Sequence, residues 1–179
     1  MRKNDRLHLT HGFGPLYDGD SEILILGSFP SVKSREQAFF YGHPQNRFWR
    51  IIAALYGEPV PGTDASAETI GAKKALILRH HLALYDVIEE CEIRGSSDSS
   101  IRAVVPADLG PILRGSRVRR IFVNGQTAGK YYQKYLEPVT GIEATVLPSS
   151  SPANAAWSLE KLIAAWKVLR SGDFTGTIA

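Results

Sequence analysis

The sequence predicts an α/β layered fold with a mostly parallel sheet, because short apolar runs alternate along the chain with segments of helical periodicity. These runs have the length and composition of buried strands; the first ends in glycine, and a glycine follows the third. They are residues 23–27, 83–88, 119–124 and 143–147. We expect 23–27, 119–123 and 143–147 to be adjacent parallel strands. Sheets of this class hold their sites at the carboxyl ends of the strands.

Helical patterns fill the intervals between the expected strands. They follow Asn46, span Ile70–Leu82, 106–114 and 126–136, and end with 158–170. The third has Pro106 near its start, a position that proline favours. The last, SLEKLIAAWKVLR, is the clearest, with Ser158 as its N-cap and with Lys161 and Lys167 on its outer face.

Composition bounds the class of protein. The chain has 179 residues, of which 44% are hydrophobic and 22% charged, so we expect one globular domain over 1–179 with a flexible tail at 171–179. The net charge of +3 permits an anionic partner without demanding one. The single cysteine, Cys91, excludes an internal disulfide and a multi-cysteine metal site. No apolar run is long enough for a membrane span, so we expect a cytoplasmic protein.

Familiar cofactor and nucleophile patterns are incomplete. GSFPSVKS at 27–34 follows a strand, but a phosphate loop needs glycine where Val32 stands. The G-x-S-x-G pattern of a nucleophile elbow is absent. The adjacent pair His80 and His81 points to different helix faces, and no metal-ligand spacing occurs. We therefore expect neither a cofactor nor a metal.

The loop FFYGHPQN at 39–46 is unusually aromatic for a connector. An aromatic face that stacks on a nucleobase contributes roughly 1–3 kcal/mol, although these rings could also pack beneath their own loop. His43 could serve only a turn. Asn46 could cap the helix that follows, since asparagine fills that position well.

The loop LPSSSPANA at 147–155 lacks an apolar period and follows a strand. Its hydroxyl groups and backbone N–H groups suit phosphate oxygens. The alternative is an ordinary loop of serine and proline.

Taken together, GSFPS, FYGHPQNRFW, LYDVIEECEIRGSSDSSI, RIFVNG and LPSSSPANA resemble the hypoxanthine-DNA glycosylase branch of the uracil-DNA glycosylase superfamily. HPQNRFW is also similar to the HPANRFW of mismatch-specific uracil-DNA glycosylases. The resemblance covers about residues 8–170. It implies a three-layer α/β/α sandwich with a short, mainly parallel central sheet. It also implies a monofunctional, metal-free hydrolysis of the N-glycosidic bond of a deaminated base, after the nucleotide is flipped out of the duplex.

The resemblance carries over to particular residues. Where mismatch-specific relatives have the water-activating asparagine of GINPG, this chain has Phe29, so the catalytic amide is expected from Asn46, which would hold the water or the base edge. Tyr41 falls where relatives carry a stacking phenylalanine. The expected base contacts are Gly27, Ser28, Phe29, Tyr41 and His43.

The second loop departs from the uracil-specific pattern. Ser149 stands near the histidine that stabilises a departing pyrimidine, and Ala153 is smaller than the leucine of the relatives' intercalating wedge. The loop is still expected to grip and wedge DNA through Ser149, Ser150, Ser151, Pro152, Ala153 and Asn154.

The expected partner is DNA carrying a deaminated base, mismatched or single-stranded, bound by a monomer with no membrane association. Hypoxanthine is the expected base. The alternatives are a uracil or mismatch-specific glycosylase of the same fold, a non-catalytic module that binds damaged nucleic acid, and a nucleotide-handling enzyme that uses residues 27–34.

Overall fold

A four-stranded parallel sheet forms the centre of the computed structural model, which describes residues 5–171. Its strand order is β3 (Leu82–Asp86), β2 (Ile23–Gly27), β6 (Arg120–Asn124) and β7 (Ala144–Leu147). The neighbours pair in parallel along the whole sheet. This confirms the adjacent parallel strands that the sequence predicts. The register sets Gly27 opposite Asp86 and Asn124 opposite Leu147, so the carboxyl ends of the four strands meet at one edge of the sheet.

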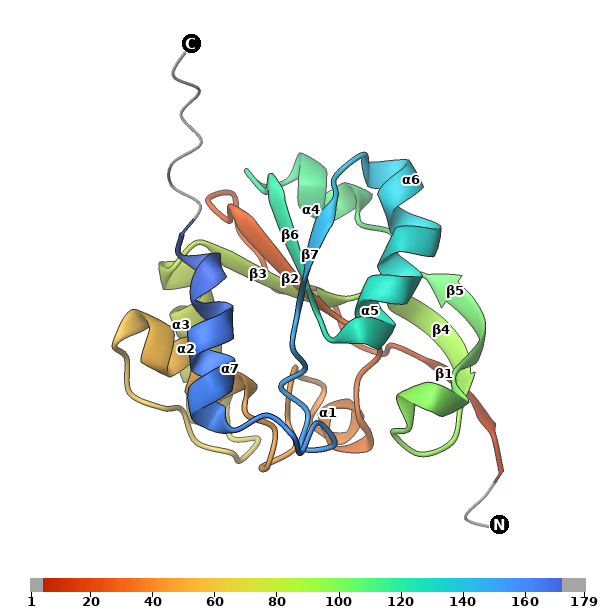
Figure 1. Ribbon diagram of the computed structural model, residues 1–179, viewed down its shortest axis with the longest axis horizontal. Helices are drawn as coiled ribbons and strands as arrows, with labels where there is room; N and C mark the ends of the chain where they lie inside the picture. Colours follow the sequence, from red (N-terminus) through yellow and green to blue (C-terminus); the bar gives the residue numbers. More distant parts are fainter. Residues whose placement is uncertain (1–4, 172–179) are drawn as a thin grey trace.

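Helices cover both faces of this sheet and complete the predicted three-layer sandwich. Figure 1 shows α2, α3 and α7 to the left of the strands and α5 and α6 to their right. The helical segments are α1 (Val32–Gln37), α2 (Phe48–Tyr56), α3 (Ala67–Arg79), a 3₁₀ turn (Asp98–Ser100), α4 (Gly110–Arg114), α5 (Gln126–Tyr131), a π-helical segment (Tyr132–Leu136), α6 (Glu137–Thr140), α7 (Leu159–Trp166) and a 3₁₀ turn (Lys167–Leu169).

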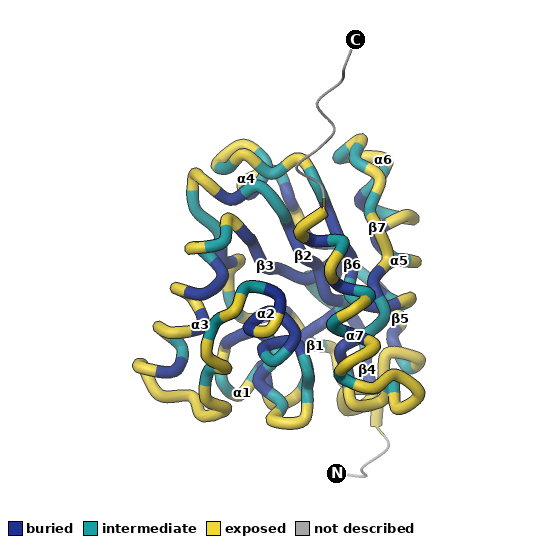
Figure 2. The backbone as a smooth tube through the Cα atoms, turned by 60° about the vertical axis from the view of Figure 1, so that its left-hand side comes forward, coloured by how far each residue is buried: buried dark blue, intermediate teal, exposed yellow. Residues whose placement is uncertain are grey.

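The core lies where the sheet meets α2 and α7. Leu24, Ile25 and Leu26 of β2 are fully buried, as are Phe48 of α2 and Trp166 of α7. Figure 2 shows this buried stretch running along the strands, while exposed backbone gathers at the loops. Aromatic edges meet across the interface, with the Phe48 and Trp166 ring centroids 5.9 Å apart. This packing fixes the start of α2 and the loop before α7 relative to each other.

A second, antiparallel sheet was not predicted. It has the order β1 (Leu7–Thr10), β4 (Ile88–Ile93) and β5 (Arg102–Pro106). β4 reads IEECEI: its two isoleucines and Cys91 are buried and its three glutamates are partly exposed, as in an antiparallel strand with one wet face. Pro106 therefore ends a strand, and the prediction that it lies near the start of a helix was wrong. The helix begins later, at Gly110.

Other helix boundaries differ because of capping. α3 begins three residues before the predicted Ile70, since the Ser66 hydroxyl accepts a hydrogen bond from the Thr69 N–H. α1 is not among the predicted helices; it begins at Val32, with Ser31 as its N-cap. The Ser158 cap of α7 is confirmed. The tail predicted for 171–179 lies outside the described residues beyond Ser171. Between residues 5 and 171, no helix has the length and apolarity that crossing a bilayer requires.

Candidate active site at the carboxyl edge of the sheet

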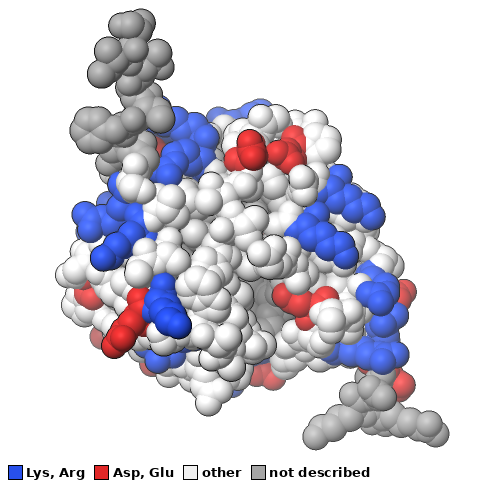
Figure 3. All heavy atoms as spheres, in the orientation of Figure 1, with Lys and Arg blue, Asp and Glu red and all other residues white. Residues whose placement is uncertain are grey.

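A cleft of about 970 Å³ opens at the carboxyl ends of the parallel strands. Figure 3 shows a hollow in the lower half of this face, flanked mostly by uncharged residues, with Lys and Arg gathered towards both edges. All the residues that the sequence and the resemblance single out line this cleft. They are Gly27, Ser28, Phe29, Tyr41, His43, Asn46, Ser149, Ser150, Ser151, Pro152, Ala153 and Asn154.

The floor of the cleft contains a carboxylate that sequence reasoning missed. Asp86 ends β3, is 5% exposed, and lines the cleft beside Gly27. A Cβ placed on Gly27 would lie 2.4 Å from Asp86 Oδ1, so this position has no room for a side chain. The other carboxylate oxygen, Oδ2, lies 2.7 Å from Nε2 of the fully buried His11. A neighbouring strand and a buried imidazole thus hold Asp86 in place.

Tyr41 forms one wall. Its ring stacks on Phe48 with centroids 4.0 Å apart, so one aromatic face is already covered. Its backbone has a φ of 51°, a left-handed conformation that is costly for a tyrosine and concentrates at functional sites. The hydroxyl is buried and makes no hydrogen bond of good geometry, although the Asn124 amide lies close by. Burial raises the pKa of Tyr41; the charge of Asp86 adds to the rise, and Asn124 opposes it.

Asn46 lies immediately before Arg47, the N-cap residue of α2. Its side-chain oxygen, Oδ1, accepts a hydrogen bond at 2.9 Å from the N–H of Phe48, the first residue of the helix. The same oxygen accepts the Ser150 hydroxyl at 2.8 Å. Nearby, His43 Nδ1 accepts the Gln45 N–H at 3.1 Å, so the expected turn is present. A neutral His43 then carries its proton on Nε2.

Arg47 joins the aromatic loop to the serine-rich loop. Its guanidinium donates to the carbonyl oxygens of Ser151 at 2.8 Å and Asn154 at 3.1 Å, and it also contacts the carbonyl oxygen of Trp157. Its backbone N–H donates to the carbonyl oxygen of Ser150 at 3.1 Å. One side chain therefore sets the path of residues 150–157 over the cleft.

Exposure divides the serine-rich loop into a buried and an open part. Ser150 is fully buried, whereas Ser149 and Ser151 are half-buried. Pro152 and Ala153 are exposed at the tip of the loop. Ser150 therefore holds the loop from within, and its hydroxyl is not exposed to a phosphate. The open part also includes residues that sequence reasoning passed over, above all Trp157, which is 36% exposed and lines the cleft.

The opposite rim carries a second carboxyl group. The Ser28 hydroxyl donates to Asp98 Oδ1 at 2.9 Å, which ties the 3₁₀ turn after β4 to the end of β2. Solvent reaches the Asp98 residue, yet the protein atoms around its carboxyl group raise its pKa by desolvation. The Ser28 hydrogen bond opposes this rise, and the charge of Asp86 adds to it. Phe29 is buried beside them, with the Arg35 guanidinium 5.6 Å from its ring.

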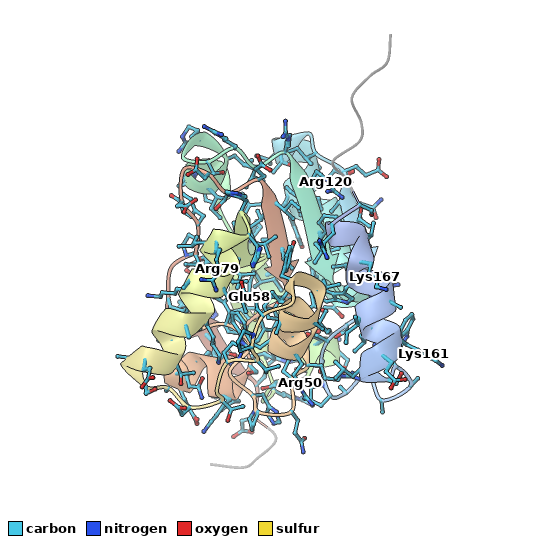
Figure 4. The ribbon with its side chains drawn as sticks, turned by 90° about the vertical axis from the view of Figure 1, so that its left-hand side faces the viewer. Arg50, Glu58, Arg79, Arg120, Lys161 and Lys167 are labelled. Carbon is cyan, nitrogen blue, oxygen red and sulfur yellow. The ribbon has the colours of Figure 1, made fainter. Side chains whose placement is uncertain are left out.

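Among residues 5–171, some charged side chains near α2 and α7 form ion pairs and others form none. Figure 4 shows Arg79 beside Glu58, and their Nε and Oε1 atoms are 2.9 Å apart. Lys161 and Lys167 extend from opposite ends of the same helical stretch, with Lys161 nearer the cleft. Lys33, the lysine of the incomplete phosphate-loop pattern, lies 3.6 Å from Glu36. That ion pair lies within α1, whose N-cap is Ser31, so 27–34 runs from the end of β2 into the start of a capped helix.

An α/β/α sandwich with an aromatic and amide-lined cleft at its carboxyl edge has the architecture of a protein that binds a nucleobase. The chain belongs to the uracil DNA glycosylase superfamily, whose family model, "Uracil DNA glycosylase superfamily", matches residues 14–170. This confirms the superfamily that the motifs indicate.

Related proteins agree with this assignment. The chain is 37% identical over 155 residues to a "Hypoxanthine DNA glycosylase" from Methanosarcina acetivorans, covering 84% of this chain and 91% of that one. It is 32% identical over 152 residues to a protein of the same name from Methanosarcina barkeri, covering 80% and 87%. The solution NMR structure of a candidate uracil DNA glycosylase from M. acetivorans matches with a TM-score of 0.71 and 33% identity, covering 92% of this chain and 99% of that one.

Proposed function

We propose that this protein is a DNA glycosylase that releases hypoxanthine from DNA. The observation that carries the proposal is the convergence in one cleft of a stacking ring at Tyr41, an amide at Asn46 and a buried carboxylate at Asp86. The relatives named hypoxanthine DNA glycosylases support the same substrate. A flipped nucleotide fits the size of the cleft, since ligand pockets commonly range over about 300–1,000 Å³.

Asp86 supplies a reason for preferring a deaminated purine. Hypoxanthine carries an N–H donor at its N1 atom, whereas adenine presents a lone pair there. A carboxylate accepts the donor and repels the lone pair. Because Asp86 is buried and held by His11, it does not turn away to accommodate adenine. A buried polar group left unpaired by the wrong base disfavours that base strongly.

The reaction is hydrolysis. The C1′–N9 bond breaks with its electron pair leaving on the base, the water oxygen bonds to C1′, and a proton from that water ends on the released base. Stacking on Tyr41 and exclusion of solvent favour the flipped state, while positioned dipoles stabilise the charge that develops. No lysine is found among the described residues that line the cleft, so a Schiff-base intermediate has no amine nucleophile there. The DNA backbone stays intact.

The protein acts as a monomer on weakly paired DNA. Ala153 is the small residue at the exposed tip of the serine-rich loop, and a methyl group fills the vacated stack poorly. Flipping costs least where the base is mismatched or single-stranded. Ser149 and Ser151 contact the phosphates beside the flipped nucleotide, and Pro152 to Asn154 enter the gap.

The test is base release from an oligonucleotide containing deoxyinosine by wild type and by Asn46→Ala. We expect hypoxanthine and an abasic strand that breaks only after alkali treatment. The variant should be slower by roughly 10²–10⁴-fold, the usual scale for losing a positioned catalytic group, while DNA binding is retained. Wild-type activity in Asn46→Ala would leave Asn46 as a cap alone. A borohydride-trapped adduct would contradict hydrolysis, and tight binding without base release would identify a non-catalytic binding module.

A further inference from the structure

Ser150 is the centre of a buried hydrogen-bond network in which each of its polar groups is used. Its N–H donates to Asn124 Oδ1 at 3.0 Å, and its hydroxyl oxygen accepts from Asn124 Nδ2 at 2.9 Å. Its hydroxyl also contacts Asn46 Oδ1 at 2.8 Å. Its carbonyl oxygen accepts the Arg47 N–H at 3.1 Å. A fully buried serine connected in this way fixes the side chains around it.

The direction of each hydrogen bond in this network follows from the backbone. A backbone N–H only donates, so the Asn124 atom facing the Ser150 N–H is its oxygen, and Asn124 Nδ2 is left to donate to the Ser150 hydroxyl oxygen. The Ser150 hydroxyl proton is then free to donate to Asn46. The Asn46 atom that receives it also faces the Phe48 N–H, so that atom is an oxygen. Turning the Asn46 amide over would set donor against donor at both contacts.

The side-chain oxygen of Asn46 consequently has no lone pair left to accept a further hydrogen bond. A carbonyl oxygen has two lone pairs, and the Phe48 N–H and the Ser150 hydroxyl occupy both. Among residues 5–171, no group accepts from Nδ2, although Asn46 lines the cleft and is half-buried. Towards a ligand, this side chain offers N–H donors only. An amide that activates water needs the opposite polarity, because it must accept a proton of that water.

We propose that Ser150 is a positioning residue that holds Asn46 as an N–H donor to the departing base. The inference rests on the proposed function and deepens it. As the C1′–N9 bond breaks, the electron pair spreads over the purine, and its ring nitrogens and O6 become stronger acceptors. A fixed N–H donor at such an atom stabilises the transition state more than the ground state. Asn46 therefore acts on the leaving group, and the water is not its ligand.

Asn46→Asp is the decisive variant. The carboxylate keeps one oxygen to accept from Phe48 and Ser150, and aspartate caps helices well, so folding is preserved. The N–H donors are lost. We expect single-turnover base release to fall as far as in Asn46→Ala, by roughly 10²–10⁴-fold. If Asn46 instead activates water, aspartate is a better acceptor, and release should stay near wild type or rise. That result would overturn the proposal.

Ser150→Ala tests the positioning role. We expect base release to slow by roughly 10–100-fold through misorientation of Asn46, with DNA affinity unchanged. In the Asn46→Ala background the same change should cause no further loss, because the two residues act as one unit. Ser21→Ala is the matched control: Ser21 is also fully buried, but it lies before β2, and its hydroxyl donates to the Leu82 carbonyl oxygen. It should lower stability without changing release per folded molecule. An additive loss in the double variant would overturn the positioning role.

Running these variants on both hypoxanthine and uracil substrates separates this inference from the proposed substrate. If wild type releases uracil faster, the substrate assignment fails, while the comparison of Asp with Ala on uracil still decides the polarity of Asn46. If wild type releases neither base, the proposed activity is wrong. Calorimetric measurement of free hypoxanthine binding then tests whether Asn46 is a hydrogen-bond donor. Asn46→Asp should then weaken binding as much as Asn46→Ala does. Unchanged or tighter binding would overturn the donor role.

Discussion

The buried imidazole of His11 lies 2.7 Å from the Asp86 carboxylate, and this contact fixes that carboxylate in the floor of the cleft. His11 is 1% exposed and comes from the segment after β1, whereas Asp86 ends β3. The antiparallel sheet, which has no counterpart in the sequence prediction, thus brings a residue to the floor of the site. We propose that His11 holds Asp86 in position to bind the N1–H group of hypoxanthine.

His11→Ala should lower the free energy of unfolding by about 3 kcal/mol, because it leaves the buried Asp86 without its partner. The matched control is His8→Ala. His8 lies 3.4 Å from Glu90, but both side chains are well exposed, so the change should stay within about 1 kcal/mol. Urea denaturation of the variants measures both. Equal effects would show that the His11–Asp86 contact contributes no more than a surface pair.

Asp98→Asn should stabilise the protein at neutral pH. Desolvation raises the pKa of Asp98 in the folded state, so the folded protein binds this proton more tightly than the unfolded chain. Stability therefore falls as pH rises from the unfolded pKa through the raised folded pKa, and the penalty persists above it. Asparagine still accepts from Ser28 and carries no charge. Thermal denaturation from pH 3 to 7 should show the advantage of the variant growing with pH, and a constant difference would contradict this assignment.

Lys161→Ala should weaken DNA binding, and Lys167→Ala should not. Both lysines are exposed on the same helical stretch, but Lys161 lies in the first turn of α7, close in the chain to Trp157 at the cleft, and Lys167 is about 9 Å further along the axis. A lost phosphate contact lowers the slope of log affinity against log salt concentration by about 1. Titrations over a range of salt concentrations measure this slope. Identical slopes in the two variants would contradict a phosphate contact at Lys161, and they would show that the DNA does not pass over the first turn of α7.

Ala153→Leu should reduce the preference for weakly paired substrates. Arg47 holds the loop on which Ala153 sits, and a larger apolar side chain at the exposed tip would occupy the gap left by the flipped base. Activity on hypoxanthine opposite cytosine should rise towards that on single strands. Ala155→Leu is the control, since Ala155 is exposed in the same segment and is not among the residues that line the cleft. An unchanged preference in Ala153→Leu would assign the loop to phosphate contact alone.

Local signals made the central sheet predictable. The run ILILG is fully apolar up to its glycine, as buried parallel strands are, and β2 ends at Gly27 as expected. β4 gives no such signal, because three glutamates interrupt its apolar residues and its pairing with β1 joins distant segments. Pro106 was misread for a related reason: proline suits both a helix start and the end of an edge strand.

The candidate site was predictable as a set but not in its internal contacts. Loops after parallel strands converge at one edge, so each predicted site residue lines the same cleft. Asp86 and Asn124 were read only as members of the predicted strands 83–88 and 119–124. The partners of Ser150 lie 26 and 104 positions away in the chain, and no local pattern predicts a hydrogen bond over such distances. Ser150 is buried whereas Ser149 and Ser151 are half-buried, and a run of three identical residues does not indicate which of them is buried.

The most direct measurement is the single-turnover rate of base release from otherwise identical oligonucleotides carrying hypoxanthine, xanthine, uracil or a thymine mispair. We expect hypoxanthine to be released fastest, and faster from single-stranded or mismatched DNA than from a pair with cytosine. Each product strand should remain intact until alkali is added. Faster release of uracil than of hypoxanthine, or no release of any base by folded protein, would contradict the proposed function.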